Sequence, residues 1–169
     1  MKPKLKNVVL ILVVCLTSIA VAATDTATQN VTVTFSEIAT LSVSGDPGTL
    51  TISTPATPGD LPADETDSTT TMAWTCNVDA ALTRKITGSI DALFSGVNLY
   101  AEVTAAGSNG TSAGKTQFAA ATTDYDFVTG ITNENTSGET ITYTAEVSSM
   151  VAPYTDTTQV VTWTLTEDS

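Results

Sequence analysis

The chain has 169 residues, with 18 acidic side chains, only six basic ones and no histidine. Because an imidazole is the base or the ligand in Ser-His-Asp triads, Cys-His pairs and ordinary zinc sites, the composition excludes these kinds of site. The formal net charge of −12 repels nucleic acid and anionic lipid, so it also excludes a DNA- or RNA-binding role.

The first 22 residues have the composition of a secretory leader. Lys2, Lys4 and Lys6 precede an almost unbroken apolar run over 8–20, and residues 20–22 read Ala-Val-Ala, a small-x-small cleavage pattern. We therefore predict a signal peptide at 1–22, export to the cell surface or beyond, and one domain over 23–169. The run of about 13 apolar residues is shorter than the roughly 20 that span a bilayer as a helix. No later segment is long and apolar enough to serve as an anchor, so we expect no membrane span.

The two cysteines limit the covalent chemistry of the chain. Cys15 follows Leu12-Val13-Val14, a weak lipoprotein-box pattern without the usual small residue before the cysteine, so lipidation is a minor alternative to simple cleavage. After cleavage Cys76 is the only thiol, and no internal disulfide can form. Three basic residues then remain beside all 18 acidic ones, a charge of 3 − 18 = −15 that favours cations or basic partners.

Apolar and polar residues alternate with a period of two along most of the mature chain. Met72, Trp74 and Cys76, for example, alternate with threonine and alanine, which is typical of a strand with one buried face. The ranges that read as strands are 31–36, 38–43, 49–53, 71–76, 85–90, 97–104, 116–120, 127–131, 141–147 and 160–166. Turn residues concentrate in four ranges between them, 45–48, 55–68, 107–114 and 133–138, which we expect to be loops.

These patterns predict an all-β, antiparallel, two-sheet β-sandwich of about nine or ten strands, of the immunoglobulin-like or pilin-like kind. The expected core residues share the apolar phase of their strands: Val31, Val33, Phe35, Trp74, Val97, Leu99, Ile141, Tyr143, Val161 and Trp163.

An acidic cluster in the predicted loop 55–68 is the best candidate cation site. It consists of Asp60, Asp64, Glu65 and Asp67. A calcium ion would relieve the repulsion among these carboxylates, although their spacing does not match an EF-hand loop. The alternative is an ordinary solvated acidic loop. We expect no other cofactor.

Two tyrosines are candidates for binding a glycan. Tyr100 lies on the polar phase of its strand, and Tyr125 lies between two aspartates in a predicted loop. Tyrosines at such surface positions are also common without any ligand.

Both terminal strands lack the residues that guard an exposed sheet edge. Lysine and proline discourage further strands from docking, and neither occurs in 31–36 or 160–166. We expect the subunits to associate through Val31, Val33 and Phe35 and through Val161, Trp163 and Leu165. A segment near 24–35 would be donated to a neighbour, or edges would pair directly. The alternative is an intramolecular first strand.

The final segment resembles a group of exported proteins. Residues 152–165 read APYTDTTQVVTWTL, which resembles the closing segment of spore coat U and related secreted pilin-like domains, where Tyr-Thr-Asp-Thr introduces an alternating last strand. The resemblance implies an immunoglobulin-like sandwich that builds fimbriae or coats by strand complementation. The chain departs from these domains in lacking their disulfide and their early cysteine-containing strand. A weaker resemblance links Trp163-Thr164-Leu165 to the second motif of WxL cell-wall-binding domains, but Trp74-Thr75-Cys76 does not complete the first.

The sequence therefore favours a non-enzymatic, exported structural subunit of a cell-surface fibre, pilus, coat or matrix. The alternative is a secreted glycan- or cell-wall-binding adhesion module, which calcium would stabilise. A third hypothesis is a hydrolase that uses two carboxylates, but solvated residues such as Glu102 and Glu146 would look the same in an inactive protein.

Overall fold

The computed structural model describes residues 25–53, 55, 57–79, 81–104, 110–155 and 157–168. The chain divides into two units, Met1–Thr34 and Phe35–Ser169. Residues 25–34 of the first unit contain no helix or strand, and all nine described strands belong to the second unit. The leader predicted at 1–22 lies outside the described residues. No helix that could cross a membrane occurs among those described.

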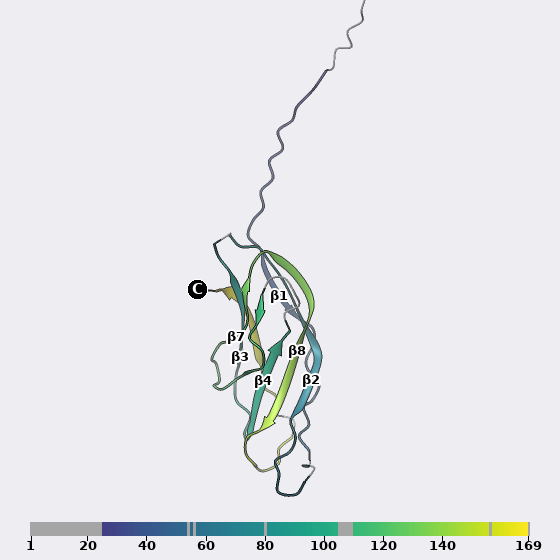
Figure 1. Ribbon diagram of the computed structural model, residues 1–169, viewed down its shortest axis with the longest axis vertical. Coiled ribbons are helices and arrows are strands. Elements are labelled where there is room, and N and C mark those ends of the chain that lie inside the picture. The colour runs from purple at the N-terminus through teal and green to yellow at the C-terminus, as the bar shows by residue number, and fades with distance from the viewer. Residues whose placement is uncertain are drawn as a thin grey trace, which may run out of the picture. The chain divides into compact units, whose positions relative to one another are not determined.

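The second unit is a sandwich of two antiparallel sheets (Figure 1). The larger sheet has the order β1 (Ala39–Val43), β2 (Glu65–Cys76), β8 (Glu134–Val147), β4 (Val97–Val103) and β6 (Thr116–Gln117). The smaller has the order β5 (Thr111–Ser112), β7 (Tyr125–Ile131), β3 (Arg84–Ile90) and β9 (Val161–Glu167). All strand pairs are antiparallel. The predicted all-β two-sheet sandwich is confirmed.

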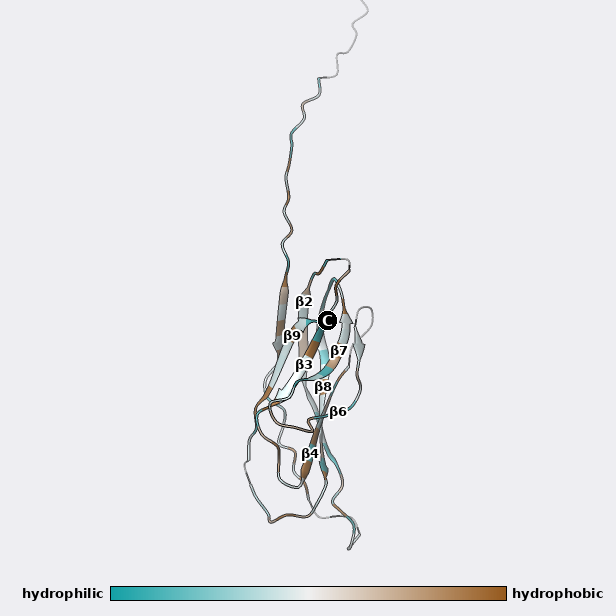
Figure 2. Ribbon diagram, turned by 90° about the vertical axis from the view of Figure 1, so that its left-hand side faces the viewer, coloured by the Kyte–Doolittle hydropathy of each residue, from teal (hydrophilic) through white to brown (hydrophobic). Residues whose placement is uncertain are grey.

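Alternation along the strands places the apolar side chains between the sheets. In the larger sheet Met72 and Trp74 of β2, Leu99 of β4 and Ile141 and Tyr143 of β8 are buried. The smaller sheet contributes Ile86, Ile90, Phe127, Val128 and Ile131, and Phe118 joins them from the segment after β6. Since burying a side chain of this size contributes about 1.5–3 kcal/mol, this cluster is the main source of stability. In Figure 2 the hydrophobic colour accordingly lies mainly on strands such as β4.

The start of β8 was predicted to be a loop because residues 133–138 are rich in Asn and Gly. The structure instead places a β-bulge there: Ser137 and Glu139 pair with the consecutive residues Ala73 and Met72, and Gly138 between them adopts φ +80°. Glycine enters this conformation at little cost, so the residue that suggested a turn allows the long strand to continue.

Other predicted boundaries also needed correction. The range 55–68 was expected to be a loop, but its last four residues begin β2, and β2 and β8 run side by side along the sandwich (Figure 1). The strand predicted at 49–53 does not form. The short β5 lies within the predicted loop 107–114, of which the structure describes residues 110–114.

The strand predicted over 31–36 does not form either. Residues 25–38 contain no helix or strand, and the side chains of Val31, Val33 and Phe35 are 82%, 84% and 77% exposed. The prediction that they belong to the core was wrong, because β1 is the first strand among the described residues and the core cluster does not include them. The alternating pattern of this segment is therefore not explained by burial within its own domain.

The two ends of the sandwich carry different connections. One end, called here the N-terminal pole, contains Ile38, Asn77 and Arg84, where the chain enters β1, leaves β2 and enters β3. The other, the far pole, contains Gly96 and Val160, where the chain enters β4 and β9.

Candidate functional site

Two of the four edge strands are long enough to pair with another chain. β5 and β6 have two residues each, whereas β1 has five and β9 has seven. β1 and β9 approach one another across the sandwich, so the two long edges lie on the same side. Among the described residues neither has a strand on its outer side. The backbone N–H and C=O groups there can accept a further strand.

β9 carries three of the residues that the sequence assigned to strand assembly. Val161, Trp163 and Leu165 pack against the core but are only partly buried. The Trp163 ring lies edge-on to Phe127, with 4.7 Å between ring centroids, and its Nε1–H donates to the Tyr143 hydroxyl at 3.3 Å. Trp163 thus ties the edge strand to the opposite sheet. A strand added beside β9 would cover the parts of these side chains that remain exposed.

Three contacts fix the point where the N-terminal segment leaves the sandwich. The Asn77 side chain donates from Nδ2 to the Ser36 carbonyl at 2.9 Å and accepts from the Ile38 N–H at Oδ1. Buried Arg84 pairs with the Glu37 carboxylate. Sequence reasoning missed these residues, since a single Asn after a strand and an isolated Arg give no distinctive signal.

The segment before this exit is uncharged and alternating. Residues 26–36 contain no acidic or basic side chain, in a chain that has 18 acidic residues, and Val31, Val33 and Phe35 share one phase. A charge-free alternating stretch that is not buried in its own domain is suited to a strand that pairs elsewhere.

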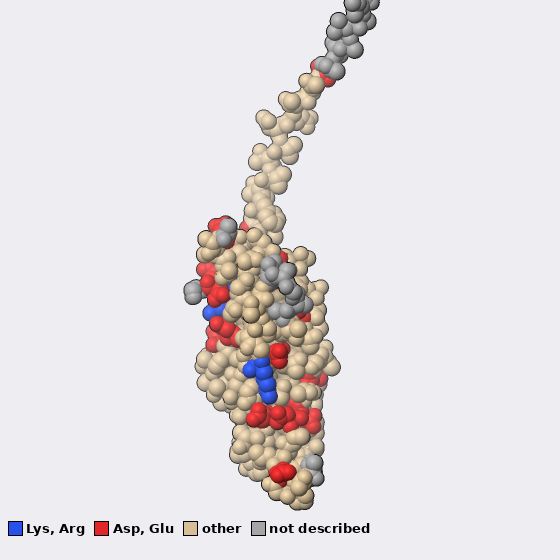
Figure 3. Space-filling view, in the orientation of Figure 1, with Lys and Arg blue, Asp and Glu red and all other residues tan. Residues whose placement is uncertain are grey.

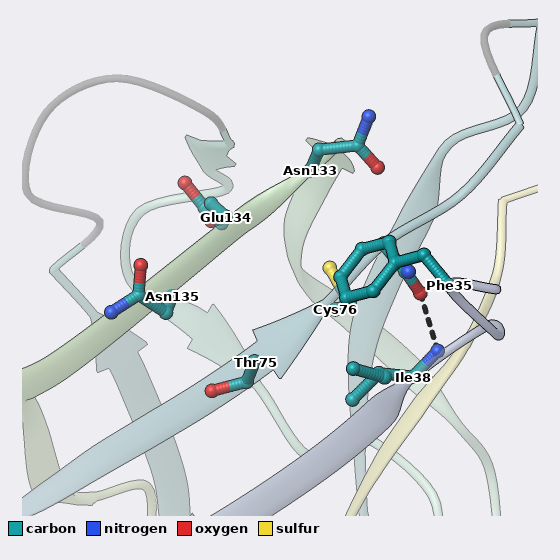
Figure 4. Close-up of a pocket in the computed structure, with 8 residues that line it drawn as sticks. Phe35, Ile38, Thr75, Cys76, Asn133, Glu134 and Asn135 are labelled. Carbon is teal, nitrogen blue, oxygen red and sulfur yellow. Dashed lines mark hydrogen bonds between the residues drawn. The ribbon is translucent and has the colours of Figure 1, made fainter. Parts of the chain in front are cut away.

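An open pocket of about 490 Å³ lies at the N-terminal pole (Figure 4). It is lined by Phe35, Ile38, Thr75, Cys76, Asn77, Asn133, Glu134 and Asn135. The Cys76 thiol donates to the Thr132 carbonyl at 2.9 Å, and burial raises the pKa of this thiol. Burial therefore disfavours the reactive thiolate, and Cys76 packs in the core cluster.

The acidic residues considered for calcium do not form a cation site in the described part of the chain. Asp60 and Asp64 precede β2, and Glu65 and Asp67 lie within it. No three His, Cys, Asp or Glu side chains among the described residues could together hold a metal ion. Asp67 instead accepts from the Thr69 hydroxyl at 2.7 Å and the Thr69 N–H at 3.0 Å, which lower the pKa of its carboxyl, as does a bond from the Gly48 N–H.

The two candidate glycan-binding tyrosines lie on different sheets. Tyr100 is on β4, and the Lys115 ammonium sits 4.4 Å from the centre of its ring while pairing with Glu146 at 3.7 Å. Tyr125 is the first residue of β7 rather than part of a loop, and its ring meets buried Phe118 edge-on, with 6.3 Å between centroids. The structure does not bring these rings together into one aromatic surface.

The few basic residues of the sandwich are already engaged. Lys85 pairs with Asp126 at 3.2 Å, as Arg84 does with Glu37 and Lys115 with Glu146. On the face shown in Figure 3 red acidic surface far exceeds blue basic surface. No lysine lies on β1 or β9, so neither long edge carries the residue that usually guards it.

Comparison with known proteins found no matching family model, no similar curated protein and no similar solved structure. The resemblance of residues 152–165 to pilin-like domains stays a prediction.

Proposed function

We propose that this chain is a non-enzymatic structural subunit, exported by the leader predicted at 1–22, whose copies assemble into a surface fibre, pilus, coat or matrix. Residues 25–36 of one copy add as a strand beside β9 of another. The observation that carries the proposal is the match between an exposed, uncharged, alternating segment and an open edge strand, β9, that is uncharged up to its last residue, Glu167.

The chemistry of the two partners is complementary. Residues 160–166, like 26–36, contain no charged side chain, so their pairing brings no like charges together in a strongly acidic protein. Backbone hydrogen bonds would supply affinity, and Val31, Val33 and Phe35 would lie over the exposed parts of the apolar residues of β9.

The covalent geometry favours exchange between copies over folding back. Every described strand pair is antiparallel, and an antiparallel segment that covers the whole of β9 places Phe35 beside Val161 at the start of β9. Val161 pairs with Ile90, which is 90 − 84 = 6 residues, or about 20 Å, along β3 from the N-terminal pole. Phe35 is three residues from Ile38, a backbone reach of about 10 Å at most. The segment of a second copy is not limited by this short connection, so it can reach the start of β9.

The test measures assembly of the mature chain, residues 23–169. Light scattering over a concentration series and negative-stain electron microscopy report on that assembly. Val33→Asp places a carboxylate on the apolar phase of the segment, and Thr32→Asp places the same charge on the other phase as a matched control. Burying an unpaired carboxylate costs more than the 1.4 kcal/mol that corresponds to a tenfold change. We therefore expect Val33→Asp to raise the concentration needed for assembly at least about tenfold, and Thr32→Asp to leave it nearly unchanged.

Equal effects of the two variants, or a wild-type chain that is monomeric at every concentration, would contradict the proposal. A monomer that binds cell-wall polysaccharide would favour the adhesion module instead.

A further inference from the structure

Five large apolar side chains are exposed together at the far pole. They are Leu93, Met150, Val151, Tyr154 and Val160, with Met150 as much as 70% exposed. They come from the loops 91–96 and 148–160, which hold one another in place. We call these five residues the far-pole patch.

Five hydrogen bonds join the described residues of the two loops, and three of them show how the loops are held. The Tyr154 hydroxyl donates to the Ser95 carbonyl at 3.1 Å, the Ser148 N–H to the Gly96 carbonyl at 2.9 Å and the Val160 N–H to the Asp91 carboxylate at 2.8 Å. The far-pole patch is therefore a formed surface whose side chains are presented by mutually bonded loops.

Close packing also contributes to this surface. Gly96 has φ +72°, and a Cβ added there would lie 2.7 Å from Cγ1 of Val151. The sequence around the patch is uncharged over 92–100 and 148–155. Apolar side chains gathered on the surface of a soluble protein are typical of interaction sites.

We infer that the far-pole patch is a docking surface for the N-terminal pole of a second copy of this chain, so that subunits stack head to tail. The inference rests on the proposed function and adds a second contact to it. If residues 25–36 of one copy lie antiparallel to β9 of another, Phe35 sits beside the start of β9. The donor's N-terminal pole then has to meet the acceptor's far pole.

The N-terminal pole has the surface that this contact requires. Ile38 and Leu82 are exposed apolar residues there, next to Phe35, and the five residues of the far-pole patch that they would meet are all apolar. A contact between two different surfaces leaves one pole free on each end of the assembly, so growth continues as an open filament.

Disulfide trapping tests the contact. Leu82→Cys and Met150→Cys are prepared as separate full-length mature chains, mixed in equal amounts and oxidised at a concentration at which the wild type assembles. Wild-type Cys76 stays in both, because it is buried, and the wild-type chain should give no disulfide dimer. A mixture of Met150→Cys with Thr104→Cys is the matched control, since Thr104 is exposed at the end of β4, away from either pole.

The 82–150 heterodimer should exceed each homodimer and the 104–150 product at least tenfold, and a chain with both cysteines should give a ladder of oligomers. No excess of the 82–150 product overturns the inference. If the Val33→Asp variant still loses assembly in that case, the proposed function stands without the pole contact. A wild type that never assembles, together with cysteine variants that never form the 82–150 product, would overturn both.

Discussion

Replacing Gly88 with alanine should destabilise the sandwich, because the added methyl group would come too close to Trp163 on the open edge strand β9. Gly88 on β3 pairs with Trp163 on β9, and a Cβ added to it would lie 2.8 Å from Cε2 of Phe127 and 2.9 Å from Cζ3 of Trp163. Carbon atoms in contact prefer about 3.5–4.0 Å, so both rings would have to move. Overpacking of this kind costs about 1–3 kcal/mol, and the reduced freedom of the unfolded chain offsets about 0.4–1 kcal/mol of that.

We therefore expect Gly88→Ala to lose about 1–2 kcal/mol, which lowers the Tm by about 2–8 °C in a domain of this size. Urea and thermal unfolding followed by circular dichroism would measure both quantities. In a Trp163→Leu background the same glycine change should cost about 1 kcal/mol less, because one of the two rings is gone. An alanine variant as stable as the wild type, or an equal cost in both backgrounds, would show that Trp163 does not pack on Gly88 as described.

Three further predictions concern the segment, the core and one loop. A chain beginning at Ser36 should keep the wild-type Tm by circular dichroism but fail to assemble; a large loss of Tm would mean that the segment belongs to its own core. Burial raises the pKa of the Tyr143 hydroxyl, so the unfolded chain ionises first, near pH ~10, and stability should fall as the pH rises above that value. Urea unfolding between pH 8 and 11 should show a smaller fall for Tyr143→Phe, and an identical fall would rule out this residue as the cause. The pKa of Asp67 is lowered, mainly by the Thr69 hydroxyl, so its contribution is present above pH ~4 and is lost as the pH falls through the folded-state pKa. Asp67→Ala should accordingly be less stable at pH 7 and less sensitive to acid, whereas an unchanged acid profile would refute that role.

Alternation predicted the strands well where the chain has one buried and one exposed face. β4 and β9 were found within one or two residues of their ends, because every second residue of each is apolar and points to the core. The same rule failed at Gly138, where a residue typical of turns occupies a bulge within β8. Local composition cannot distinguish these cases, because the bulge is defined by its pairing with distant Met72 and Ala73.

The segment 31–36 is the opposite case, because its sequence has the pattern of a strand and yet forms none in the described structure. Its pattern is that of a strand, but it pairs with no strand among the described residues, and Val31, Val33 and Phe35 are exposed rather than part of the core. The residues that fix its exit, Asn77 and Arg84, act through contacts with Ser36 and Glu37, which are 77 − 36 = 41 and 84 − 37 = 47 positions away. Such contacts leave no trace in the spacing of the sequence.

Hydrogen exchange of the mature chain over a concentration series tests strand addition most directly. If residues 25–36 pair beside β9 of a neighbour, backbone amides of 26–36 and those of β9 should become protected together as the concentration rises, while amides of β2 and β8 stay protected throughout. Val33→Asp should abolish the concentration-dependent protection in both segments, and Thr32→Asp should keep it. Fast exchange of 26–36 at every concentration, in samples that nevertheless assemble, would contradict the assignment of this segment as the added strand.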